Sequence, residues 1–466
     1  MHNRESRVFP RDRPDQAPHG NFAPRELGDS LWLPTHRSRM RCGMSTAAPH
    51  KAGCEPTAGA TPLAGRLAAL GMALLVLMPL AMWLANRSAP LMLGLSAAFF
   101  VAAALVAEGW RPFLRRLLAS LRGPIALSLC AFLAWSLVTL AWSHHPGQGL
   151  TAWGELALPL AFALAIAASG RFRPGLRDDR WLAYTLIAAI VLMIIELASG
   201  LAVRTMLDIG KQAGFVFNRP ALTCLVLSAA VLAALMRSPI LPRDRLLAGL
   251  VMLAVAAIAA FSDSGAAALG LAIMASCWLA TLLLPRLTLA AVALAFAATM
   301  LLAPVLGRLG DTALPPALHE KLAGSHSRER VDIWLSFGEA IQARPMLGSG
   351  FGTSPALDRH PVALEVSAAH RPMLAVGHPH SAPMQAWVET GAIGTAFLAV
   401  AGLALLFRLR RLPVRQLAPR LALFAAAFSI ASLAHGAWQG WWIASLALAT
   451  LWLFFDLPAR IDRSGD

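Results

Sequence analysis

Two arginines and one histidine carry the chemistry that this sequence suggests: Arg219, Arg330 and His380. An arginine guanidinium is planar, permanently charged and well matched to phosphate oxygens, so Arg219 and Arg330 can stabilise the charge that builds on an anionic leaving group. An unperturbed histidine titrates near neutrality, so His380 can accept a proton from an attacking hydroxyl or orient it. These residue types indicate group transfer from an anionic carrier, with all three in catalytic roles.

Further candidates for substrate binding lie near these three in the sequence. Arg328 stands with Arg330 at the start of a predicted helix, where free backbone N–H groups also favour anions. Arg204 and Lys211 precede Arg219 in one polar segment. Glu389 falls inside an apolar span, where a carboxylate is costly and usually functional. It either pairs with an arginine, orients His380 or forms a structural hydrogen bond to another helix.

The composition sets the class of protein. The chain has 466 residues, of which 57% are hydrophobic and only 14% are charged. Its mean hydropathy is +0.59, and its apolar runs are about 20 residues long, the span of a bilayer core. We therefore predict an all-α polytopic membrane protein. The net charge of +15 would suggest a nucleic-acid partner in a soluble protein, but in a membrane protein the positions of the charges decide.

About twelve transmembrane helices are predicted, with one large polar loop that contains short helices. Residues 1–66 form a disordered cytoplasmic tail, about nine helices lie over 67–306, the loop covers 307–382, about three helices lie over 383–456, and 457–466 form the cytoplasmic C-terminus. The predicted spans lie near 67–85, 90–107, 124–142, 149–169, 182–201, 220–236, 244–262, 264–284, 286–306, 383–407, 419–435 and 438–456.

The distribution of arginines predicts the orientation. Arginines gather in the even-numbered connections, which the positive-inside rule places in the cytoplasm together with both termini. Two segments on the opposite side also carry cations: Val203–Arg219 and the loop over 307–382. Cations on the side where insertion disfavours them indicate an anionic ligand at the membrane surface. The remaining external connections are short and charge-poor, and they include NRS at 86–88.

The long loop has an order of its own. Apolar residues at helical spacing predict a helix over Arg330–Arg344 that lies flat on the bilayer or packs on the spans beneath it. Pro345, Gly348, Gly350 and Gly352 then end the helix and allow a sharp turn. The members of the apolar face are Val331, Trp334, Phe337 and Ile341.

At the end of the loop the chain resembles the O-antigen ligase and polymerase family. The motif is a histidine and a small polar residue, nine further residues, and then G-x-x-G-T, here His380, Ser381, Ala382–Thr390 and Gly391–Thr395. The resemblance extends to R-x-x-I-W at 330–334, P-x-x-G-x-G at 345–350, N-R at 218–219 and S-x-S-x-A at 262–266. Ser381, kept as a substrate-binding candidate, stands where many members have Asn.

The resemblance implies an inverting, metal-independent glycosyltransferase of the inner membrane. It would move a glycan from an undecaprenyl-diphosphate carrier to an acceptor hydroxyl on the periplasmic face, the acceptor being lipid A core, a glycan or a protein. Membrane lipids are its other partners, and no nucleic acid, cofactor or metal is implied. The donor is already activated in the membrane, and the sequence accordingly has no dinucleotide or P-loop fingerprint.

Simpler roles remain open for several of these residues. Arg219 is alternatively a snorkelling interfacial residue, and His380 a cap of the following span, while His378 is expected to be structural. The histidines at 360, 370, 378 and 380 are irregularly spaced and lack cysteine partners, so no metal site is predicted. Glu155 and Glu196 are expected at the membrane interface. Three tryptophans are predicted to form an aromatic belt: Trp438, Trp441 and Trp442.

Three functions fit the sequence. The first is a ligase that transfers glycan to lipid A core. The second keeps the chemistry and changes the acceptor, as in an O-antigen or exopolysaccharide polymerase or a protein O-glycosyltransferase. The third is a transporter or flippase of lipid-linked oligosaccharide, which would show internal repeats and polar residues at the bilayer midplane. No repeat is visible and the spans are nearly free of charge, which disfavours the third.

Overall fold

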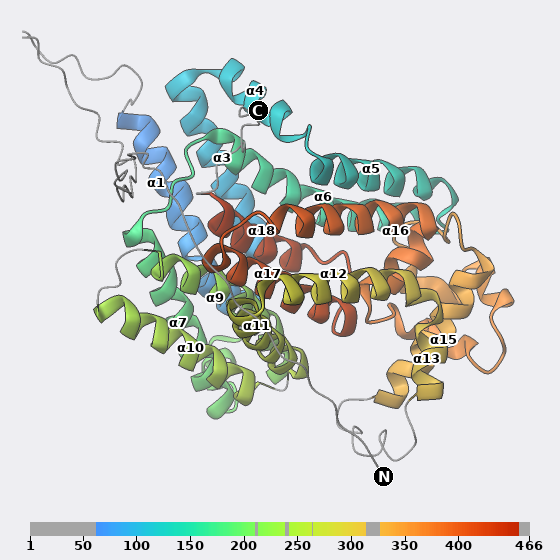
Figure 1. Cartoon of the computed structure of the whole chain (residues 1–466). Helices are drawn as coiled ribbons and strands as arrows, with labels where there is room; N and C mark the ends of the chain where they lie inside the picture. The colour runs from blue at the N-terminus through green and yellow to red at the C-terminus, as the bar shows by residue number, and fades with distance from the viewer. Residues whose placement is uncertain (1–61, 210–212, 238–241, 263, 314–326, 456–466) are drawn as a thin grey trace, which may run out of the picture. The chain divides into compact units, whose positions relative to one another are not determined.

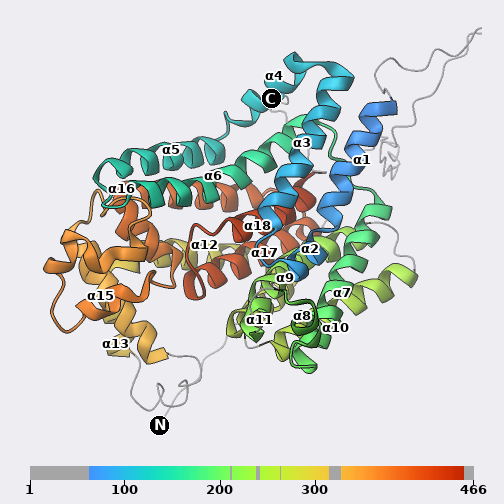
Figure 2. The same cartoon turned by 180° about the vertical axis from the view of Figure 1, so that it is seen from behind.

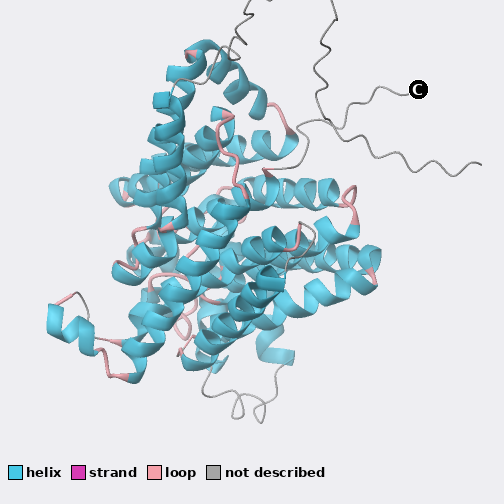
Figure 3. Ribbon diagram, turned by 90° about the vertical axis from the view of Figure 1, so that its left-hand side faces the viewer, coloured by secondary structure: helices cyan, strands magenta, loops and turns pink. Residues whose placement is uncertain are grey.

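The computed structural model describes residues 62–209, 213–237, 242–262, 264–313 and 327–455. Over these residues the chain is helical and contains no strand, so the predicted all-α fold is confirmed (Figure 3). The predicted N-terminal tail lies almost wholly outside the described residues, and so does Lys211.

Ten described helices are long and apolar enough to cross a membrane, or eleven if the bent pair α1 and α2 counts as one span. The chain is therefore a multi-pass membrane protein. The last apolar helix, α18, has only 15 residues. The spans are α3 (Ala89–Glu108), α5 (Pro124–Thr139), α6 (Pro146–Ser169), α7 (Leu176–Ala198), α9 (Asn218–Leu235), α10 (Pro242–Phe261), α11 (Gly265–Leu283), α12 (Pro285–Leu302), α16 (Ala382–Leu409) and α17 (Val414–Leu433), with α1 (Pro62–Val76), α2 (Met78–Leu84) and α18 (Gly440–Phe454) beside them.

Local sequence explains where these helices begin. Alanine and leucine are strong helix formers and dominate the spans. Proline stands in the first turn of several, at Pro90, Pro124, Pro146, Pro285 and Pro383, where its missing N–H has no helical partner to lose. Shorter helices connect the spans: α4 (Trp110–Ser120), α8 (Ala202–Leu207), α13 (Leu306–Ala313), α15 (Ser327–Ala343), and the 3-10 helices η1 (Leu140–Trp142), η2 (Gly214–Phe217), η3 (Ala303–Val305), η5 (Ser354–Arg359), η6 (Pro361–Glu365) and η7 (Arg371–Val376).

Helix α9 lies inside the bundle. It packs against α2, α7, α10, α11, α17 and α18, and 83% of the most apolar window of its span is buried. Helices α5, α6 and α16 run side by side elsewhere in the bundle (Figures 1 and 2). Because α9 begins at Asn218, the asparagine–arginine pair at 218–219 stands at the end of the most enclosed helix.

The segment over 327–381 covers one end of the bundle, here called the loop end. Figures 1 and 2 show α15 beside the ends of α12 and α16, with α13 next to α15. The predicted helix over Arg330–Arg344 is present as α15. Its apolar residues Val331, Phe337 and Ile341 are each at most 1% exposed. Their neighbours in the core include Leu357, Val362, Leu374, Met384 and Val388, so α15 packs on the loop and on α16 rather than lying flat on a bilayer.

The predicted aromatic belt is wrong. Trp438, Trp441 and Trp442 are 9%, 4% and 2% exposed, so they pack inside the protein instead of facing lipid headgroups. Glu196, expected at the interface, is also buried, at 1% exposure. A tryptophan near a span end is equally compatible with a lipid interface and with an internal hydrogen bond, and the indole N–H of Trp438 makes the latter, to Glu389.

Candidate active site

A cavity of about 890 Å³ lies at the loop end, and it brings together Arg204, Arg219, Arg330 and His380. Its walls come from the α2–α3 connection, the segments before α9 and before α16, the starts of α9, α11 and α15, and the connection between α17 and α18. The lining residues are Leu84, Ala85, Asn86, Arg87, Arg204, Ile209, Phe215, Val216, Asn218, Arg219, Leu222, Ser264, Gly265, Ala266, Arg330, His378, His380, Ala434, His435, Gln439 and Trp441.

Arg219 reaches the cavity from the first turn of α9. Its guanidinium carbon lies 5.8 Å from the centre of the Trp441 ring, within the range of a cation–π contact. No described carboxylate forms an ion pair with it. Because α9 is enclosed by other helices, Arg219 is not at a lipid-facing position from which it would snorkel.

Arg330 enters the cavity from the start of α15. Its guanidinium donates a hydrogen bond to the carbonyl of Leu433, at the end of α17. Burial lowers the pKa of Arg330 from its usual value, but a guanidinium stays charged in proteins. This bond ties the loop helix to the segment that follows α17, which also contacts His380.

His380 is held in an uncommon backbone conformation, with φ of +50°. Its Nδ1 lies 3.1 Å from the carbonyl oxygen of Ala434. A carbonyl only accepts, so Nδ1 carries the proton and Nε2 keeps its lone pair. Burial lowers the pKa of His380, and the charge of Arg330 lowers it further. The Ala434 hydrogen bond acts in the opposite direction and raises it. His380 is therefore neutral at physiological pH, with Nε2 able to accept a proton.

Two more histidines share the cavity. The Nδ1 of His378 accepts the backbone N–H of His380 at 3.3 Å, and the two rings lie 4.2 Å apart. Burial is the main cause that lowers the pKa of both His378 and His435 to about 4. The sequence does not single out His435, because nothing in the local pattern HGAWQG shows that it meets residues far away in the chain.

The cavity is strongly cationic. Four arginines line it, and within the described residues no aspartate or glutamate does. Arg204 is the most enclosed of the four, at 6% exposure, and it donates to the carbonyl of Trp83 at 2.5 Å. Arg87 was missed from the sequence because its NRS segment looked like a short, charge-poor turn. Such a cavity suits a ligand with several negative charges.

The glycine turn after α15 packs into a break in α16, the helix that follows His380. Gly391 has φ of +65° and breaks α16, and a Cβ there would overlap the backbone of Met346. The turn fills this break: the N–H of Ser349 donates to Val388 O at 2.7 Å, and that of Ala392 donates to Pro345 O at 2.8 Å. The close packing at Gly391 is therefore a contact between two segments of main chain.

Glu389 is buried in the same junction rather than in the cavity. Its carboxylate accepts from Gly352 N at 2.8 Å and from the Trp438 indole at 2.7 Å. It also accepts from Gln385 at 3.0 Å and from Ser354 N at 3.4 Å. Among the described contacts neither an arginine nor His380 touches it, so the structural hydrogen bond is the alternative that the geometry favours over substrate binding.

Two other predicted substrate-binding residues, Arg328 and Ser381, do not line the cavity. The side chain of Arg328 is 58% exposed and pairs with Asp311 at 3.1 Å and with Asp332 at 3.4 Å. Ser381 is 1% exposed, and its hydroxyl finds no hydrogen-bond partner among the described residues. Lys211 lies outside those residues.

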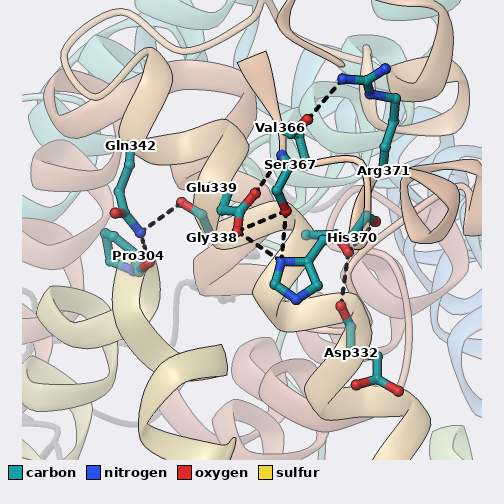
Figure 4. Close-up of polar contacts among 10 residues, drawn as sticks. Pro304, Asp332, Gly338, Glu339, Gln342, Val366, Ser367, His370 and Arg371 are labelled. Atoms are coloured by element: carbon teal, nitrogen blue, oxygen red, sulfur yellow. Dashed lines mark hydrogen bonds and ion pairs between the residues drawn. The ribbon is translucent and has the colours of Figure 1, made fainter. Parts of the chain in front are cut away.

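His370 lies in the loop and does not line the cavity. His370 Nδ1 lies 2.7 Å from Glu339 Oε1 and 3.2 Å from Ser367 Oγ (Figure 4). Both contacts meet the same ring nitrogen, so this is not a relay from serine through histidine to carboxylate. It fastens the loop to α15. Within the part of the chain that the structure describes, no group of three metal-ligating side chains is placed to hold an ion.

Comparison with known proteins agrees with the motif resemblance. Residues 248–399 match the model of a family described as O-antigen ligase, which confirms the predicted resemblance to that family. The matched range runs from α10 to α16 and includes Arg330 and His380 but not Arg219. No significant match was found among curated proteins or among solved structures.

Proposed function

We propose, on the premise that this chain is an O-antigen ligase-like membrane glycosyltransferase, that it moves a glycan from undecaprenyl diphosphate to an acceptor hydroxyl at the periplasmic face of the bacterial inner membrane. The observation that carries the proposal is the cavity in which Arg219, Arg330 and His380 meet. Its cationic lining complements a diphosphate, and a neutral histidine beside it complements a hydroxyl that must lose a proton.

In this proposal the acceptor oxygen attacks the anomeric carbon from the face opposite the diphosphate. The bond from that carbon to the phosphate oxygen breaks, its electron pair stays on the diphosphate, and the anomeric configuration inverts. His380 Nε2 takes the hydroxyl proton, for which its tautomer leaves a lone pair. Arg219 and Arg330 stabilise the charge on the leaving group, and Arg87 and Arg204 add positive potential.

The transfer assay uses the full chain in vesicles with a polyprenyl-diphosphate glycan and candidate acceptors. We expect the glycan to appear on an acceptor, with release of polyprenyl diphosphate and without added metal. An unchanged donor, with every acceptor tried and with the protein folded, would contradict the proposal. Transport without a new glycosidic bond would favour a transporter or flippase instead.

The acceptor is the point at which the alternatives divide. A clean deletion, followed by analysis of surface glycans, separates them: unligated lipid-linked polymer indicates a ligase for lipid A core, and single repeat units indicate a polymerase of O-antigen or exopolysaccharide. Loss of glycan from proteins alone indicates a protein O-glycosyltransferase. We favour the ligase because the matched family is described as O-antigen ligase.

A further inference from the structure

His435 lies in a connection between α17 and α18 whose position is fixed from both sides. The N–H of Ala437 donates to Gln385 Oε1 at 2.8 Å, and the indole of Trp438 donates to Glu389. The imidazole of His435 is itself enclosed by Trp441 and Trp442, with ring centres 5.3 and 4.9 Å away. The ring therefore lies in the wall of the cavity, packed against two indoles.

The hydrogen bonds of His435 define its tautomer. Nδ1 lies 2.9 Å from the carbonyl oxygen of Gly436, and since a carbonyl only accepts, Nδ1 carries the proton. Burial lowers the pKa of His435 to about 4. The charge of Arg219 also lowers this pKa, whereas the Gly436 hydrogen bond raises it. The ring is therefore neutral at physiological pH, and Nε2 is a hydrogen-bond acceptor.

Within the part of the chain that the structure describes, this acceptor has no partner. His435 is 9% exposed as a whole residue, its Nε2 atom is itself buried, and no described residue donates a hydrogen bond to that atom. A buried acceptor left without a donor is unfavourable. An ionised diphosphate bound at Arg219 cannot supply that donor, because its oxygens only accept. A sugar hydroxyl attached next to the diphosphate can.

We propose that His435 Nε2 accepts a hydrogen bond from a hydroxyl of the first sugar of the donor glycan, the sugar that is bonded to the diphosphate. The proposal rests on the proposed function, because it places the diphosphate at Arg219. His435 is then a specificity-determining residue that recognises the sugar, and Trp441 supplies an aromatic wall beside it. A donor that lacks the hydroxyl leaves the imidazole nitrogen unpaired, which is how a polar site rejects an analogue.

Equilibrium binding tests this independently of turnover. The full chain in detergent is titrated with farnesyl diphosphate and with farnesyl diphosphate carrying glucose, galactose or N-acetylglucosamine, and tryptophan fluorescence is followed. We expect His435→Phe to weaken binding of the best glycosylated probe by about 3- to 10-fold, the worth of one neutral hydrogen bond, and to leave farnesyl diphosphate unchanged. His435→Gln restores an acceptor, so its affinity for the glycosylated probe should lie within about 2-fold of that of the wild type. This difference is well below the worth of the hydrogen bond.

A matched control and a cycle sharpen the test. His144 also has a buried ring nitrogen without a described partner, but it lies outside the cavity, so His144→Phe should bind both probes as the wild type does. Analogues of the best sugar that each lack one hydroxyl complete a double-mutant cycle. The analogue that lacks the recognised hydroxyl should bind the wild type and His435→Phe with equal affinity.

The outcomes separate the two proposals. Equal weakening of bare and glycosylated probes by His435→Phe, or no weakening of either, would overturn the assignment of His435, as would a wild type that binds no sugar better than the bare diphosphate. Sugar discrimination that depends on His435, in a protein that transfers nothing in the parallel assay, would support the assignment and contradict the glycosyltransferase proposal.

Discussion

Replacing Glu389 by glutamine changes one carboxylate oxygen into an amide NH2 group within a junction where every described partner is a donor. One oxygen of Glu389 accepts from Gly352 N and Trp438, and the other accepts from Ser354 N and Gln385. Glutamine can keep only one of these pairs. The other two donors then face a third donor with no access to water, since the side chain is 0% exposed.

Each buried donor left unpaired costs about 1–3 kcal/mol, so Glu389→Gln should lower the free energy of unfolding by roughly 2–6 kcal/mol. Thermal unfolding of the detergent-solubilised full chain measures this. Glu365→Gln is the control, because Glu365 has 47% of its side chain exposed and pairs with Arg344 at 3.3 Å, a surface pair worth about 0–1 kcal/mol.

Activity measured well below the unfolding midpoint completes the test. We expect the midpoint and the transfer rate of Glu389→Gln to fall together, because the same carboxylate holds the glycine turn and the connection that carries His435. The opposite result would be an unfolding midpoint equal to that of the wild type together with a loss of transfer above about 100-fold, which is the range for a lost catalytic group. That result would refute this reasoning and would indicate that Glu389 acts directly on the substrate.

Three further expectations concern the cavity and its surroundings. His380→Ala and Arg219→Ala should each reduce transfer by roughly 10²-fold or more while the protein still inserts and folds, and near-normal transfer in both would refute the site. Burial and Arg330 lower the pKa of His380, so kcat/KM should fall with acid only below the usual histidine value near 6.5; Arg330→Gln should move that limb to higher pH in the residual activity, and Arg330→Lys should not. His360 lies outside the cavity and burial lowers its pKa to about 4 from 6.5. Between these values the unfolded chain binds a proton that the folded chain does not, so stability is lost as pH falls from 6.5 to 4; His360→Gln should remove roughly 3 kcal/mol of that loss, measured as a smaller drop in the unfolding midpoint.

The class of fold could be predicted, and residues of the candidate site could be proposed, because each depends on local patterns. Apolar length shows that a segment can span a bilayer, and the asparagine–arginine pair at 218–219 does open α9. The predicted helix over Arg330–Arg344 also appears, as α15. Arg219, Arg330 and His380 were named separately, and the cavity contains all three.

Residues whose role depends on distant partners could not be predicted. A span is apolar on the faces that meet lipid and on those that meet other helices, so periodicity did not show that Trp438, Trp441 and Trp442 point inward. Glu389 was rightly marked as unusual, but its donors include Gly352 and Trp438, which lie on separate segments. Arg87 resembled any short turn between spans.

The junction between the glycine turn and α16 is made largely by main-chain groups. Its structure therefore does not depend on the side chains that the turn presents at the surface. Met346 and Leu347 sit within the turn, yet they are 58% and 49% exposed, and their side chains are not needed to hold it. Substitutions of these two side chains leave the main-chain contacts of the junction in place. The outer face of the turn is therefore free to diversify from one relative to another while the register underneath it stays constant.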